Sequence, residues 1–135
     1  MQAVYFNINF PSLSSVSDLR SDDLGLIVKT MNGKLRGTNL NLDVNAWLGI
    51  PYAKAPTGKL RFSKPMLPKS WNGIKDVNKL PNACPQSSDE TFGNFSGSQQ
   101  WNPNTKISED CLYLNVYAPK DIKANEVFIY IPYFL

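Results

Sequence analysis

The sequence predicts an α/β fold class, in which these 135 residues supply strands and long coil to a sheet. Residues 112–117 alternate apolar and polar side chains, as a half-buried strand does. Residues 127–131 form a continuous apolar run of the kind that lies buried on both faces in the middle of an α/β sheet. The Asn32-Gly33 pair lies between two short apolar runs and is typical of a hairpin turn. The length fits one small domain or part of a larger one.

The N-terminal third predicts an arm followed by a small edge meander. Residues 1–22 are rich in serine and lack apolar periodicity, which predicts a loose N-terminal arm ahead of an ordered region at 23–135. Residues 26–28 and 35–36 form the two strands of the Asn-Gly hairpin. A third strand through residues 46–50 ends at Pro51 and completes an antiparallel meander.

A proline-rich segment follows the meander. Residues 51–85 hold six of the ten prolines, which excludes regular helix and favours extended coil. Such coil is either a solvated linker or a segment packed on a larger body. The second alternative is favoured because large apolar side chains seek burial. They are Trp47, Tyr52, Phe62, Met66 and Trp71.

Composition excludes several function classes. The net charge of +3 comes from scattered basic residues, so a nucleic-acid partner is poorly supported. The chain contains no histidine, so its own residues cannot form a Ser-His-Asp triad, a Cys-His pair or a histidine-dependent metal site. We therefore assign no catalytic residue, no cofactor and no metal. Residues 127–135 are too short an apolar run for a membrane span, and residues 1–11 lack the pattern of a signal peptide.

The two cysteines enclose a distinctive loop. Cys84 and Cys111 are either joined in a disulfide or are two free buried thiols, and their spacing alone favours neither. The tripeptide Asn94-Phe95-Ser96 is a sequon, which makes Asn94 a candidate N-glycosylation site.

The same loop combines acidic and aromatic side chains. Four carboxylates accompany one lysine, so the loop has a local charge of −3, and Phe92 and Trp101 lie among them. Aromatic faces attract cations, and nearby carboxylates steer cations toward them, so the loop is a candidate cation site. The alternative is a solvated acidic loop whose Trp101 simply packs, and composition alone favours that alternative.

Three sequence segments resemble a known family. The stretch SEDCLYLNVYAP at 108–119 resembles the second signature of type-B carboxylesterases. The stretches WLGIPYAKA at 47–55 and LRFSKP at 60–65 resemble the N-terminal core of that family. The stretch FSGSQQWNPN at 95–104 is similar, more narrowly, to the cholinesterase branch. The resemblance implies the N-terminal part of an α/β-hydrolase fold: edge meander, proline-rich coil, disulfide-closed loop and the first strands of the central sheet.

The resemblance also assigns roles around the loop. It implies that Cys84 and Cys111 form a disulfide whose loop walls the active-site gorge. It implies that Trp101 receives the quaternary ammonium of choline by cation-π contact and that Asp89 is the acidic residue at the gorge rim. Ser87 stands where many relatives carry an aromatic rim residue.

Arg61 and Glu109 match a structural ion pair of the family. The resemblance implies that this pair pins the base of the loop, so Arg61 is a positioning residue and not a substrate clamp. A planar guanidinium suits that role because its donors are fixed in a fork.

The family's catalytic elements have no counterpart here. A G-x-S-x-G nucleophile elbow and its histidine are missing, and the stretch GNFSG at 93–97 places serine fourth. Pro132 follows the apolar run where relatives carry a Gly-rich oxyanion loop. We expect residues 23–135 to stop before the oxyanion loop and nucleophile, and this chain alone to be inactive.

The resemblance leaves three functional alternatives. The first is part of a secreted or cell-surface serine esterase that hydrolyses small cationic choline esters. The second is a non-catalytic adhesion or recognition domain on the same fold. The third is a truncated product with no function of its own, and we favour the first because of the combined segments at 95–104 and 108–119.

Overall fold

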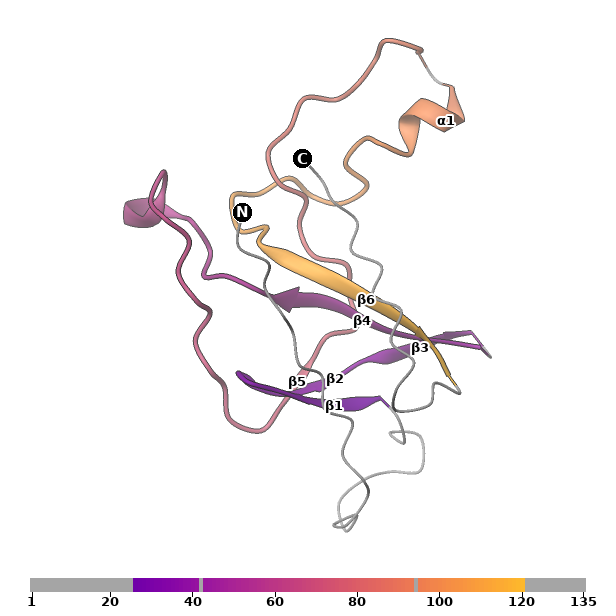
Figure 1. Ribbon diagram of the computed structural model, residues 1–135. Coiled ribbons are helices and arrows are strands. Elements are labelled where there is room, and N and C mark those ends of the chain that lie inside the picture. Colours follow the sequence, from indigo (N-terminus) through magenta and orange to yellow (C-terminus); the bar gives the residue numbers. More distant parts are fainter. Residues whose placement is uncertain (1–25, 42, 94, 121–135) are drawn as a thin grey trace.

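The computed structural model describes residues 26–41, 43–93 and 95–120, and they form two three-stranded sheets (Figure 1). The first sheet has the order β1-β2-β5, with β1 and β2 antiparallel and β2 and β5 parallel. The second has the order β3-β4-β6, and both of its pairings are antiparallel. The strands are β1 (Ile27–Thr30), β2 (Gly33–Arg36), β3 (Thr38–Asn41), β4 (Val44–Pro51), β5 (Ile74–Asp76) and β6 (Tyr113–Pro119). The predicted arm at 1–22 and the apolar run at 127–131 lie outside the described residues.

The predicted hairpin is confirmed, but its turn lies one residue earlier than expected. Thr30 pairs with Gly33, so Met31 and Asn32 form the turn and Gly33 begins β2. The Thr30 hydroxyl donates to the Gly33 carbonyl at 2.9 Å and accepts from the Asn32 amide at 3.2 Å. A Cβ on Gly33 would lie 2.6 Å from the Trp71 indole nitrogen, so the glycine makes room for that ring.

The predicted three-strand meander is wrong, and Gly37 gives the physical reason. The chain leaves the first sheet at Gly37, whose amide donates to the Leu26 carbonyl at 2.9 Å. A Cβ there would overlap the Ala46 carbonyl oxygen and lie 2.8 Å from the Trp47 ring. This close crossing transfers the chain to the second sheet, where β4 pairs with β3 and β6 and not with the hairpin.

The proline-rich coil is packed near its two ends, where Ala53 and Val77 are buried, and is exposed between them. It contains a short 3-10 helix, η2 (Gly58–Leu60), before it reaches β5. Trp71 packs against the core, and its indole nitrogen donates to the Lys34 carbonyl at 2.8 Å. Tyr52 and Met66 are exposed, and Phe62 is 99% exposed. The predicted burial therefore holds for Trp47 and Trp71 and is wrong, among the described residues, for these three side chains.

Val77 joins the two sheets immediately after β5. Its amide donates to the Arg36 carbonyl of β2 at 2.8 Å, and its carbonyl accepts from the Leu48 amide of β4 at 2.7 Å. One peptide segment therefore bridges a strand of each sheet.

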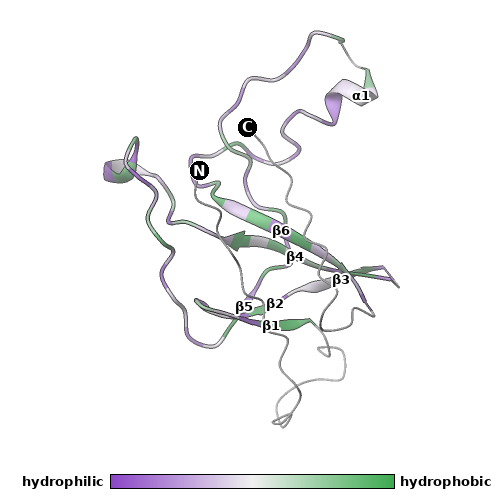
Figure 2. Ribbon diagram, viewed as in Figure 1, coloured by the Kyte–Doolittle hydropathy of each residue, from purple (hydrophilic) through white to green (hydrophobic). Residues whose placement is uncertain are grey.

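The core lies where the two sheets meet. Figure 2 shows hydrophobic stretches, in green, along β4 and β6. The Trp47 indole nitrogen, although buried, is satisfied by the Leu26 carbonyl at 2.9 Å. Burying one aliphatic or aromatic side chain stabilises a fold by about 1.5–3 kcal/mol, so this cluster is the main source of stability among the described residues. Its members are Val28, Leu35, Trp47, Ile50, Val77, Val116 and Ala118.

A β-bulge in β4 interrupts the alternation of its side chains. Trp47 pairs with Val116 and Ile50 pairs with Leu114, so two residues face the single residue Asn115. The Asn115 side-chain oxygen accepts the Gly49 amide at 2.9 Å. Gly49 has φ +77°, which glycine adopts readily.

Candidate functional site

The loop between the cysteines is closed by a disulfide. Cys84 and Cys111 are bonded, with their Cα atoms 5.0 Å apart, which decides between the two alternatives left by their spacing. The two ends of the loop also form a short parallel bridge: the Ala83 amide donates to the Lys106 carbonyl at 3.0 Å, and the Ser108 amide donates to the Ala83 carbonyl at 2.9 Å. Closing a 27-residue interval stabilises a fold by about 3.5 kcal/mol in the chain-entropy model.

Arg61 and Glu109 meet at the base of the loop. The Arg61 Nε atom lies 2.7 Å from Glu109 Oε1, and the two side chains are 52% and 44% exposed. Exposed ion pairs contribute only about 0–1 kcal/mol. The pair therefore orients the coil after η2 against the loop base more than it stabilises the fold.

Tyr113 and Asp110 form a second contact at the base that sequence reasoning missed. The Tyr113 hydroxyl donates to Asp110 Oδ1 at 2.8 Å. Partial burial, followed by this hydrogen bond and the negative charge of Asp110, raises the pKa of Tyr113 to about 12. A phenol and a carboxylate three residues apart are too common a pattern for the sequence to predict their contact.

Asn102 organises the far end of the loop around a short helix, α1 (Ser96–Gln99). Its Oδ1 atom accepts the Asp89 amide at 2.7 Å, and its Nδ2 atom donates to the Asp89 carbonyl at 3.1 Å. The same Nδ2 atom lies 3.1 Å from Gln99 Oε1 in the helix. Asn102 thus ties the segment that carries Asp89 to the segment that carries Trp101.

Asp89 and Trp101 are both exposed at this end of the loop. Trp101 is 69% exposed, so among the described residues it does not simply pack into the core. Hydrogen bonds from the Thr91 side chain and backbone lower the pKa of Asp89, which favours its charged form. The rings that carry a protein cation in the described part are Phe62 and Trp71, so Trp101 is not covered by one.

Two residues of the loop that the sequence singled out remain, Ser87 at the rim and Asn94 in the sequon. Ser87 is exposed. Asn94 lies outside the described residues, so its glycosylation stays a prediction.

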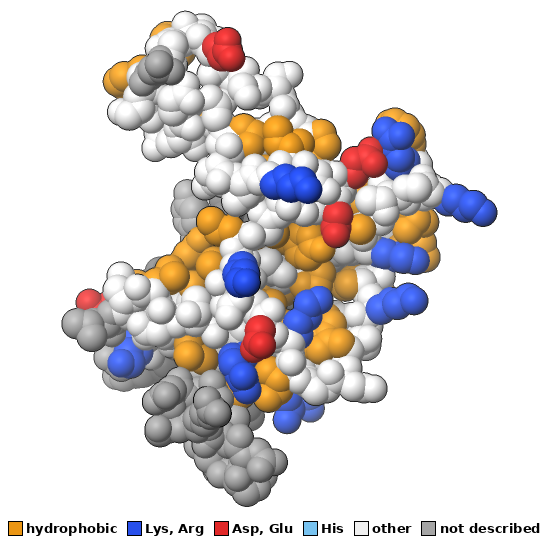
Figure 3. All heavy atoms as spheres, turned by 180° about the vertical axis from the view of Figure 1, so that it is seen from behind, with side chains coloured by type: hydrophobic (Ala, Val, Ile, Leu, Met, Phe, Trp, Pro, Cys, Tyr) orange, Lys and Arg blue, Asp and Glu red, His pale blue; other side chains and the backbone are white. Residues whose placement is uncertain are grey.

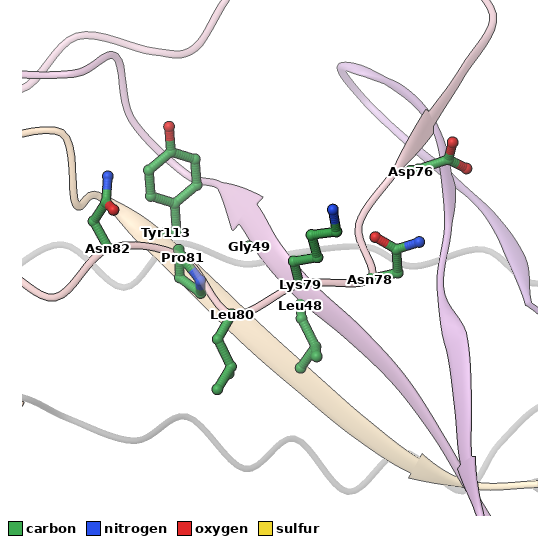
Figure 4. Close-up of a pocket in the computed structure, with 9 residues that line it drawn as sticks. All are labelled: Leu48, Gly49, Asp76, Asn78, Lys79, Leu80, Pro81, Asn82 and Tyr113. Carbon is green, nitrogen blue, oxygen red and sulfur yellow. The ribbon is translucent and has the colours of Figure 1, made fainter. Parts of the chain in front are cut away.

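An open pocket of about 280 Å³ lies elsewhere, beside β4 and β6. Figure 4 shows the Tyr113 and Lys79 side chains projecting to one side of it and Leu80 to the other. The pocket lining does not include Asp89 or Trp101, so the candidate cation site is separate from this pocket. Within the described ranges, no cluster of three metal-ligating side chains and no helix able to cross a membrane is found.

Comparison with known proteins identifies the family. Residues 25–132 match the model of the carboxylesterase family. The chain belongs to the carboxylesterase family. It is 45% identical over 113 residues to an acetylcholinesterase of Leptinotarsa decemlineata, covering 82% of this chain and 18% of that protein. It is 47% identical over 96 residues to a cholinesterase of Mus musculus, covering 69% of this chain and 16% of that protein.

These matches confirm the family resemblance and are consistent with the α/β-hydrolase fold class. The chain spans less than a fifth of the length of these two relatives. The described part of this member of the carboxylesterase family is mostly strand and coil, with the disulfide-closed loop as its most distinctive feature.

Proposed function

We propose that these residues form the N-terminal part of the catalytic domain of a cholinesterase-type carboxylic-ester hydrolase, nearer to acetylcholinesterase than to other branches. The names of the two relatives support the substrate class, since both are cholinesterases. The domain would run from residue 23 through residue 135 and onward to the oxyanion loop and nucleophile. The protein would be secreted or displayed at the cell surface, where disulfides persist.

The loop would supply the choline-binding wall of the site. Trp101 would receive the quaternary ammonium on its ring face, an interaction of about 0.5–2 kcal/mol. Asp89 would attract the cation from the rim through its negative charge. These residues bind and orient the ester, while acyl transfer to a serine and then to water would use groups outside these 135 residues, which contain no histidine.

One observation carries this proposal. The Asn102 side chain holds the Asp89 peptide at 2.7 and 3.1 Å while the adjacent Trp101 ring stays exposed. An anionic carboxylate and an uncovered indole are thereby held at the same end of the loop. No such argument favours the adhesion alternative, and neither relative above is named as an adhesion protein.

The proposal is tested with Trp101→Ala in the intact protein. Hydrolysis of a choline ester is compared with that of its neutral isostere, the 3,3-dimethylbutyl ester. The KM for the cationic ester should rise about two- to thirtyfold, the loss expected for about 0.5–2 kcal/mol, and the KM for the neutral ester much less. Phe92→Ala is the matched control, because Phe92 is an aromatic residue of the same loop and is equally exposed, at 69%. Equal losses for both esters would refute the cation-π role.

A further inference from the structure

Gln99 is the last residue of α1, and its side chain links two segments of the disulfide-closed loop. Its Nε2 atom donates to the Gly93 carbonyl, ahead of the helix, at 2.9 Å. Its Oε1 atom accepts from Asn102 Nδ2, beyond the helix, at 3.1 Å. The carboxamide therefore uses both its donor and its acceptor. An ionised carboxylate or an apolar side chain at this position could not make both contacts.

Asn102 extends these contacts to Asp89. Its Oδ1 atom accepts the Asp89 amide at 2.7 Å, and its Nδ2 atom is shared between the Asp89 carbonyl and Gln99 Oε1, both at 3.1 Å. These partners fix the orientation of the Asn102 amide group, because only its oxygen can accept an N–H and only its nitrogen can donate. We call the chain of contacts from Gly93 through Gln99 and Asn102 to Asp89 the carboxamide relay.

The backbone that follows α1 carries Trp101. The Trp101 amide donates to the Ser98 carbonyl at 3.0 Å, and the Asn102 amide donates to the Gln99 carbonyl at 3.1 Å. These two contacts continue the turn of the helix through Trp101. Gln99 is thus tied to the backbone of the Trp101 segment directly and to the backbone of Asp89 through Asn102.

The Asp89 carboxylate is oriented within its own segment. Its Oδ1 atom accepts the Thr91 amide at 2.9 Å, so the direction of the carboxylate follows the position of the Asp89 backbone. In Figure 3 this end of the loop lies at the top, and acidic side-chain atoms are visible on it. All of the relay contacts join residues between 89 and 102, so the relay needs no contact with another part of the domain.

We propose that Gln99 is a positioning residue of the choline site, which acts through Asn102 and fixes the Asp89 carboxylate relative to the Trp101 ring. This inference rests on the proposed function, in which Asp89 attracts the cation that Trp101 receives. The attraction depends on where the negative charge lies. Loosening the relay lets the carboxylate move relative to the ring, which weakens capture of a cation. A neutral ester has no such attraction to lose.

The first test needs no substrate and uses Gln99→Met in the intact protein. Methionine keeps the length and helix propensity of glutamine but makes neither hydrogen bond. Exchange of the Asp89 amide hydrogen should speed up about fivefold, the loss expected for one hydrogen bond. Gln100→Met is the matched control, because Gln100 is the next residue and makes no side-chain hydrogen bond among the described residues. Unchanged exchange in Gln99→Met, or equal speeding in the control, would overturn the proposal.

A double variant tests whether Gln99 acts through Asn102. In the Asn102→Leu background the relay is already broken, so Gln99→Met should speed the exchange of the Asp89 amide less than about twofold further. Fully multiplicative effects of the two substitutions would mean that Gln99 reaches Asp89 by another route, which contradicts the relay.

The second test compares hydrolysis of a choline ester with that of the neutral 3,3-dimethylbutyl ester. Gln99→Met should lower kcat/KM for the choline ester about fivefold and for the neutral ester less than about twofold. Added salt should narrow the difference between parent and variant, because a screened carboxylate attracts a cation weakly. Equal losses for the two esters, or a loss that salt does not change, would indicate general damage to the fold and would overturn the positioning role.

Trp101→Ala separates failure of this inference from failure of the proposed function. If Trp101→Ala discriminates between the two esters and Gln99→Met does not, the choline site stands and the positioning role of Gln99 is wrong. If Trp101→Ala affects both esters equally, the proposed function is wrong, and the inference about Gln99 fails with it.

Discussion

The Asn102 carboxamide brackets the Asp89 peptide from both sides, accepting its amide at 2.7 Å and donating to its carbonyl at 3.1 Å. The two residues are 13 positions apart, so this pair sets the distance across the loop. A ligand that contacts both Asp89 and Trp101 would therefore depend on these two hydrogen bonds.

Asn102→Leu should loosen the loop end without unfolding the protein. A net contribution of about 1 kcal/mol per hydrogen bond predicts that exchange of the Asp89 amide hydrogen speeds up about tenfold or more. Hydrogen exchange followed by NMR or mass spectrometry measures this. Asn104→Leu is the matched control, because Asn104 is exposed and makes no side-chain hydrogen bond among the described residues. Unchanged exchange in Asn102→Leu would show that the bracket contributes nothing in solution.

Thr91→Val should shift the titration of Asp89. The Thr91 side-chain hydrogen bond is the largest cause of the lowered pKa of Asp89, so its loss should raise that pKa toward the ordinary value of 3.8. A lowered pKa means that the folded state favours the Asp89 carboxylate. The resulting contribution to stability is therefore fully present above the ordinary pKa of 3.8 and is lost as the pH falls through the lower pKa of the folded protein. Carboxyl NMR titration of parent and variant measures the shift. An identical midpoint in both would contradict the assignment.

Tyr113→Phe should reduce stability at neutral pH by about 1 kcal/mol, the contribution of one hydrogen bond to Asp110. A pKa raised to about 12 means that the folded protein favours the neutral phenol. The parent's advantage over the variant is therefore complete below about pH 10 and declines as the pH rises toward 12. Urea unfolding at pH 8 and pH 11 measures this difference. A Tyr113 phenolate absorbance that appears at about pH 10 would disagree with the contact.

Gly37→Ala should destabilise the fold by about 3 kcal/mol, because the added Cβ would overlap a backbone oxygen that cannot rotate away. The control is Gly58→Asn, since Gly58 has open space around it and asparagine tolerates its φ of +55°. That change should lower the free energy of unfolding by less than about 1 kcal/mol. Urea unfolding compares the two, and similar losses would mean that the crossing at Gly37 is not tight.

The sequence predicted the local elements better than their assembly. The alternation at 112–117 correctly predicted β6, and the Asn32-Gly33 pair correctly predicted a hairpin although the turn begins at Met31. The transfer between sheets at Gly37 was missed, because a required close approach leaves no periodic signal. The bulge at Gly49 likewise disturbs the alternation on which strand prediction depends.

The site shows the same division. The cysteine spacing allowed a disulfide but did not require one, and the family resemblance made the stronger prediction. The Asn102–Asp89 bracket joins residues far apart in sequence, so no local pattern indicated it. Phe62 is exposed among the described residues and has a φ of +58°, an angle that its side-chain type disfavours, so sequence reasoning expected neither feature.

The bridge at Val77 determines how the two sheets open. Since its amide hydrogen bonds to β2 and its carbonyl to β4, neither sheet can peel away without releasing the same short segment. We therefore expect that one three-stranded sheet does not unfold alone and that its unfolding opens the whole core. The Val77 and Leu48 amides should accordingly be protected against hydrogen exchange to the same degree, as members of one cooperative unit.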